Sequence, residues 1–240
     1  MIHEHPPGLP PTHAADAPAD EAARAIRVQL LATEHWSLLA SRNLAWNESF
    51  ARAGMFLTVL TGVVVALALV AQATGFSEVF VVFALLLLPI VLFVGLATFV
   101  RLNEINEEDL VWVQGMNRLR RAYLEIDPGL AEYFITGTTE DVTGVLRTYG
   151  ARIGAVPSLR QNLSHALVTT PLMILAIDSV VAAVLVGLIL SQLGSSMQAS
   201  ALGAAVGFFG LFLFVSWWEG RKALAFWGSA RRKPTEDPSD

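Results

Sequence analysis

Four long apolar runs constrain the fold of this chain more than any other sequence feature. They occupy residues 53–74, 79–100, 171–193 and 199–218, and the only charged residue in any of them is Asp178. The hydrocarbon core of a bilayer is about 30 Å thick, so a helix rising about 1.5 Å per residue crosses it in roughly 20 residues. The sequence therefore predicts an all-α, integral membrane protein with four transmembrane helices.

Composition supports the same class. Hydrophobic residues make up 54% of the 240 residues and charged residues 15%, whereas about a quarter of a soluble domain is charged. The chain has no cysteine, which excludes disulfides, thiolate metal sites and cysteine nucleophiles.

The distribution of positive charge predicts the orientation. The links at residues 75–78 and 194–198 contain no Lys or Arg, so all 16 such residues precede the first run, follow the fourth, or lie between the second and third. Because Lys and Arg are retained on the cytoplasmic side, we expect both termini and the long middle segment in the cytoplasm. The expected location is the cell (inner) membrane, crossed four times.

The four apolar runs and the segments between them divide the chain into six predicted parts. We expect a helical cytoplasmic layer below the bilayer, preceded by a disordered tail rich in Pro and His and followed by a tail that is first basic and then acidic. The predicted parts are a tail at 1–18, an amphipathic helix at 19–52, a transmembrane hairpin at 53–100, a cytoplasmic helical segment at 101–170, a second hairpin at 171–218 and a tail at 219–240.

The amphipathic helix is expected to continue directly into the first span, because residues 19–52 contain no Pro or Gly. Ile26, Leu30 and Leu44 recur at helical spacing, with Leu31 and Leu38 alongside, which predicts packing against the middle segment. The alternative, that this helix lies on the membrane surface, is less favoured because the stretch has few basic residues.

The second span is also expected to continue out of the membrane as a helix. Asp127-Pro128-Gly129 should end it, since Pro cannot continue a helix. Thr138 with Asp141 three residues later is typical of an N-cap, and predicts a short helix that reaches about Tyr149.

Two blocks carry a resemblance to known proteins. The runs RLNEINEEDLVWVQGMNRLRRAYLEIDPGLAEYF at 101–134 and HALVTTPLMILAIDSVVAAVL at 165–185 resemble blocks of a group of four-span inner-membrane proteins of bacteria whose function is unknown. The resemblance implies an inner-membrane protein, with no activity, cofactor or catalytic residue to transfer. The layout of the first half is also similar to two-span effector domains proposed to form pores in bacterial conflict systems, but the third and fourth spans depart from it.

Asp178 is the first candidate functional residue. An acid at the centre of a bilayer costs roughly 2.5–3.5 kcal/mol, so it is usually functional or well partnered. A carboxyl group removed from water suits proton coupling or cation binding, which makes Asp178 a candidate for an ion path. If the span instead covers 174–193, Asp178 lies only about four residues, or about 6 Å, inside the cytoplasmic boundary.

Glu104 and Glu108 are the other candidates for an ion path. They share a helix face at the inner end of the second span, and a ring of such acids from several subunits would favour cations. The alternative is a solvated face that nearby arginines balance.

Small residues in the third and fourth spans predict close helix packing. Gly203 and Gly207 form a GxxxG pair, which lets another backbone approach closely, within the chain or between copies. The predicted packing residues are Gly203, Gly207, Gly210, Ala183 and Gly187.

Three classes of function remain. The preferred one is a non-enzymatic scaffold or sensor whose cytoplasmic helices bind a protein partner. The alternative is an oligomeric ion channel or small transporter that uses Asp178. We expect no enzyme, because HExxH, P-loop, GxGxxG and GxSxG motifs are missing, and no cofactor, metal or nucleic-acid partner.

Overall fold

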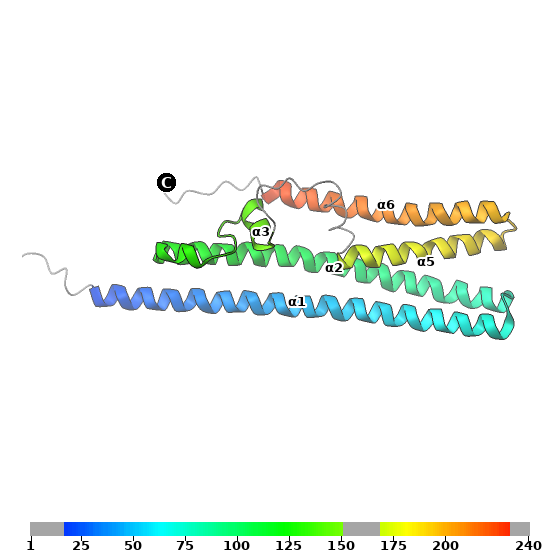
Figure 1. Cartoon of the computed structure of the whole chain (residues 1–240), viewed down its shortest axis with the longest axis horizontal. Helices are drawn as coiled ribbons and strands as arrows, with labels where there is room; N and C mark the ends of the chain where they lie inside the picture. Colours follow the sequence, from blue (N-terminus) through cyan, green and yellow to red (C-terminus); the bar gives the residue numbers. More distant parts are fainter. Residues whose placement is uncertain (1–16, 151–168, 231–240) are drawn as a thin grey trace, which may run out of the picture. The chain divides into compact units, whose positions relative to one another are not determined.

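The computed structural model describes residues 17–150 and 169–230, and all the secondary structure in these ranges is helical (Figure 1). The elements in chain order are α1 (Ala17–Thr74), α2 (Glu78–Ile126), the 3-10 helix η1 (Pro128–Tyr133), α3 (Val142–Thr148), α5 (Thr170–Gln192) and α6 (Met197–Ala230). The predicted N-terminal tail up to residue 16, the end of the chain from residue 231 and the segment at 151–168 lie outside the described residues.

Four of these helices, α1, α2, α5 and α6, are long and apolar enough to cross a membrane. The prediction of an all-helical chain with four candidate spans is thereby confirmed. The third apolar run corresponds closely to α5, whereas α6 continues well past residue 218 to Ala230.

Two of the four candidate spans are the ends of much longer helices. As predicted, α1 is unbroken from Ala17 to Thr74, and α2 continues past Pro89 to Ile126. The break after Ile126 is also confirmed: the side chain of Asp127 accepts a hydrogen bond from Gly129 N at 2.9 Å and caps η1, which begins at Pro128.

The chain divides into two compact units. The extension unit comprises Met1–Ser41 and Trp112–Ala151, and the four-helix unit comprises Arg42–Val111 and Arg152–Asp240. Each unit therefore takes one part of α1 and one part of α2, and each is described separately below.

Two tight turns organise the four-helix unit. Gly75 connects α1 to α2 and Gly194 follows α5, with φ of 64° and 77°, a left-handed conformation that glycine adopts without the strain a Cβ would cause. Both turns lie at the same end of the unit (Figure 1). The unit thus consists of two helical hairpins with their turns on one side.

The core of the four-helix unit draws on three helices. Phe56 of α1, Val91 of α2 and Leu175 of α5 are fully buried in one cluster, and Phe212 and Val215 of α6 are partly buried against it. Dispersion contacts between these closely packed side chains hold the two hairpins together.

The outward faces of the four-helix unit are also apolar. Phe93 on α2 is 73% exposed, Val206 on α6 is 71% exposed and Leu69 on α1 is 59% exposed. Water-soluble monomers rarely expose large contiguous apolar patches. Large apolar side chains thus face outward on at least three helices of this unit, within the described residues.

The extension unit buries only one side of the apolar stripe that we predicted on α1. Ile26 and Leu30 are 59% and 65% exposed, so their predicted packing is wrong. Leu31 and Leu38, which flank the stripe, are half-buried, and Leu38 Cδ1 lies 3.1 Å from the position that a Cβ on Gly115 would take. Both sides of the stripe are apolar at helical spacing, so the sequence pattern alone does not select between them.

The short helix of the extension unit begins later than predicted. Asp141, not Thr138, is the N-cap of α3, and its side chain accepts a hydrogen bond from Gly144 N at 3.1 Å. Thr139 Oγ1 donates to Asp141, which holds the capping carboxylate in place.

Candidate functional site

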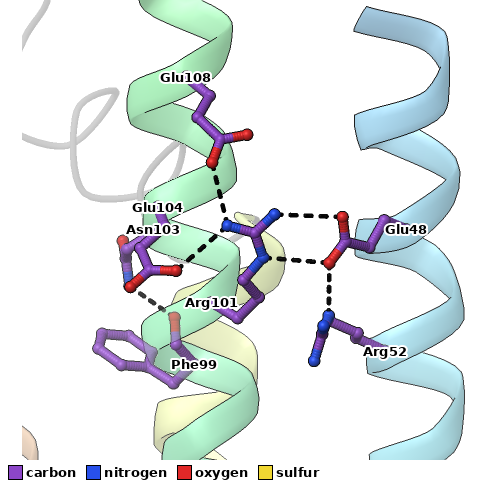
Figure 2. Close-up of polar contacts among 7 residues, drawn as sticks. All are labelled: Glu48, Arg52, Phe99, Arg101, Asn103, Glu104 and Glu108. Carbon is purple, nitrogen blue, oxygen red and sulfur yellow. Dashed lines mark hydrogen bonds and ion pairs between the residues drawn. The ribbon is translucent and has the colours of Figure 1, made fainter. Parts of the chain in front are cut away.

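A charged cluster surrounds Arg101 at the end of the second apolar run (Figure 2). Arg101 donates to both carboxylate oxygens of Glu48 on α1, from Nε at 3.0 Å and from Nη2 at 3.2 Å. Its Nη1 donates to Glu104 Oε2 at 3.2 Å and to Glu108 Oε1 at 3.0 Å. Arg52 Nε adds a further hydrogen bond to Glu48 at 2.8 Å.

Helical spacing explains this arrangement. Glu104 and Glu108 follow Arg101 by three and seven residues, which places all three on one face of α2. Hydrogen bonds from Arg101 and then from Arg52 lower the pKa of Glu48 to about 2, so this carboxylate stays ionised. The same hydrogen bonds, first from Glu48, raise the pKa of Arg101.

Two of the three acids proposed for an ion path are therefore bound to an arginine. Glu104 and Glu108 each accept from Arg101, and their charge is partly neutralised by it. A cation vestibule needs carboxylates that are free to attract an ion. The geometry favours the other interpretation, in which these acids balance nearby positive charge.

A second ion pair lies on the buried side of the same two helices. Arg42 Nε donates to Asp109 Oδ1 at 2.5 Å and Nη2 donates to Oδ2 at 3.1 Å, which is the two-point geometry of strong arginine–carboxylate pairs. The Asp109 side chain is only 7% exposed, and that of Arg42 is 20% exposed. The pair specifies how α1 and α2 align in the four-helix unit.

Asp178 is fully buried between α5 and α2. A Cβ placed on Gly95 would overlap the Asp178 carboxyl group. The carboxyl therefore occupies the space that the missing side chain of Gly95 leaves open. Within the described residues, neither carboxyl oxygen has a hydrogen-bond partner. Its neighbour Ser179, also fully buried, donates to Leu175 O of its own helix at 2.8 Å.

The position of Asp178 along the axis of α2 follows from its contact with Gly95. Arg101 lies six residues beyond Gly95 on α2, which is about 9 Å along the helix axis, whereas the turn at Gly75 is about 30 Å away. Asp178 therefore lies about midway between the centre of the second apolar run and its charged end.

The predicted small-residue sites divide into two groups. Gly203 and Gly207 on α6 contact α5: a Cβ on Gly203 would overlap Leu190, and one on Gly207 would lie 3.0 Å from Val186 Cγ2. Gly187 faces Ala204 of α6, where a Cβ would be 3.4 Å from the alanine Cβ.

The other two positions differ from these. Gly210 has no atom within 4 Å of the position of a Cβ, and Ala183 is only partly buried. The close contacts of small residues between α5 and α6 thus involve Gly187 on α5 and Gly203 and Gly207 on α6.

A polar core forms in the extension unit, where the loop before α3 docks on α2. Asn117 is fully buried, donates to Thr139 O at 2.8 Å, and accepts from Arg120 Nη1 and Thr148 Oγ1, each at 2.8 Å. The loop fits closely because a Cβ on Gly137 would overlap the backbone of Gly144.

Two ion pairs on the protein surface connect this loop to α2. Arg118 and Arg121 donate to the two carboxylate oxygens of Glu140 at 2.7 and 2.8 Å. Arg118 and Arg121 thus have a carboxylate partner in the loop before α3.

Several residues of these sites were not singled out by the sequence. Gly95 is one small residue among many in an apolar run, and Asn117 and Glu48 are polar residues on helices with many others. No local signal distinguishes them, because their roles arise from partners on other elements. Among the described residues, no group of three or more His, Asp or Glu side chains is placed to hold a metal ion.

The fold defines a class: an all-helical chain with four helices long and apolar enough to span a membrane. Comparison of the chain with protein-family models, with curated proteins and with solved structures finds no match.

Proposed function

We propose that the chain is an integral protein of the bacterial inner membrane that acts as a non-enzymatic scaffold or sensor. Embedding in a bilayer is supported by the outward apolar side chains of the four-helix unit, such as Phe93 and Val206, which lipid would cover. The orientation is supported by the absence of Lys and Arg from both turns of the hairpins. We infer that the turns face outward and both termini face the cytoplasm.

This orientation can be measured with single cysteines, because the chain has none of its own. We expect Ser196→Cys, in the exposed turn between α5 and α6, to react with a membrane-impermeant maleimide in intact cells. Ala131→Cys, on the exposed surface of η1, should react only after the cells are opened. The reverse labelling pattern would refute the proposed orientation.

The partner-binding role is carried by one observation in the extension unit. Its part of α1 exposes Ile26, Leu30 and Trp36, with Trp36 72% exposed, while it packs Leu31 and Leu38 on the other side. A helix placed in water would not be expected to present large apolar side chains on its free face unless another surface covers them. We infer that these three residues, the free face of α1, bind a cytoplasmic protein.

A photo-crosslinking amino acid at Ile26 or Leu30 of the full-length protein tests this role in cells. We expect each position to yield a crosslinked product with a second, distinct protein. Val28 is the matched control: it is also apolar and exposed, but lies about 160° around the helix from both positions.

Three outcomes would count against the proposal. They are no product at either position, an equally strong product at Val28, or a product that contains only a second copy of the chain. The last of these would indicate self-association through the same face.

The alternative class, an oligomeric ion channel or small transporter, has weaker support. Glu104 and Glu108 bind Arg101, and Asp178 faces Gly95 of the same chain instead of a surface open to neighbouring subunits. An ion path between copies would need acids that line the shared space. The geometry therefore favours the scaffold or sensor.

A further inference from the structure

We propose that the Asp178 carboxyl is a proton-binding site that holds α5 against α2 when it is protonated and loosens their contact when it ionises. The proposal goes beyond partner binding and does not depend on it. The site has two parts: the fully buried carboxyl of Asp178, and the space on α2 that Gly95 leaves free for it.

The packed arrangement suits the neutral acid. Neither oxygen of Asp178 accepts a hydrogen bond from any described residue, and the carboxyl is pressed against the α2 backbone with no exposed surface. A buried carboxylate without donors loses its hydration and gains nothing in return, which makes the ionised form very unfavourable here. A protonated carboxyl removes this cost because it carries no net charge.

Ionisation would change the contact itself. Loss of the proton to water leaves one negative charge on Asp178, and that charge needs water or a donor. Because the carboxyl fills the space beside Gly95, water can reach it only if α5 moves away from α2. Proton binding and helix packing are therefore linked, so each favours the other.

No described charged group is placed to replace the proton. The apolar runs of α1, α2 and α6 that surround α5 contain no acidic or basic residue. The nearest cation along α2 is Arg101, about 9 Å further along the axis and already bound to Glu48, Glu104 and Glu108. Arg152, Arg160 and His165 lie outside the described residues.

Infrared spectroscopy of the full-length protein in lipid nanodiscs tests the proton site directly. We expect the carbonyl band of a protonated, weakly hydrogen-bonded carboxylic acid at neutral pH, and its loss as pH is raised. The band should be missing in Asp178→Asn, which keeps the shape of the neutral acid, and retained in Glu107→Gln, which alters an exposed acid.

Spin labels test the link to packing. Cysteines at Ile90 on α2 and Val180 on α5 are suitable, because both side chains are about half exposed and the chain has no other cysteine. In the protein that keeps Asp178, the mean distance between the labels should lengthen, or the distance distribution should broaden, as pH is raised. The midpoint pH of this change should equal that for loss of the infrared band. In Asp178→Asn the distance should stay constant over that range.

Any one of four results would overturn the inference. The band could be absent from the parent at neutral pH, or persist in Asp178→Asn. The label distance could stay constant while the band disappears, or change equally in Asp178→Asn. None of these readings involves a cytoplasmic partner, so failure of this site and failure of partner binding are distinguishable.

Discussion

Gly95→Ala is expected to destabilise the four-helix unit by about 3 kcal/mol, the upper end of the range for adding a methyl group to a packed interior. The added Cβ would overlap the Asp178 carboxyl, and it projects from the backbone of α2, which cannot yield as a flexible side chain would. Either α5 must shift or the carboxyl must leave its position. Thermal unfolding of the purified protein in mild detergent measures the loss.

Two variants make this prediction specific. Gly62→Ala is the matched control, since Gly62 lies within the apolar run of α1 and has no atom within 4 Å of its Cβ position. Asp178→Ala removes the overlapping atoms, so Gly95→Ala should cost much less in that background, with a coupling of about 2 kcal/mol. Equal losses in both backgrounds would show that the two residues do not touch.

Arg42→Ala is the second change for which we expect a large effect. It removes both hydrogen bonds to Asp109 and leaves that carboxylate, 7% exposed, without its arginine. Removal of one partner from a buried pair costs roughly 3–5 kcal/mol. Because Arg42 is partly exposed, we expect the free energy of unfolding to fall by an amount near the lower limit of this range. The same thermal unfolding experiment measures it.

The controls separate the pair from general effects of charge. Arg27→Ala breaks the exposed pair with Glu125, at 3.6 Å, and should change stability by less than about 1 kcal/mol. The double variant Arg42→Met/Asp109→Leu removes both charges of the pair and should recover most of the stability. If Arg42→Ala were as stable as the parent protein, the buried carboxylate of Asp109 would not depend on Arg42 for its stability.

The acidic candidates in and beside the apolar runs show why candidate sites are harder to predict than helices. Asp178, Glu104 and Glu108 stand out in the sequence because charged residues in or beside long apolar runs are rare. Their partners do not stand out. Gly95 and Glu48 acquire roles only because α2 lies against α5 in one case and against α1 in the other.

The sequence by itself determined that the described chain is helical, where α2 ends and how many helices are long enough to span a membrane. These properties depend on neighbouring residues: the length of an apolar run, or Pro128 after Asp127. Only the tertiary structure decided that Arg42 meets Asp109, that Asp178 faces Gly95 and which side of the apolar stripe on α1 packs. The reason is that rotation and axial alignment of helices far apart in the chain are set by contacts between them, and several alignments satisfy the same apolar pattern.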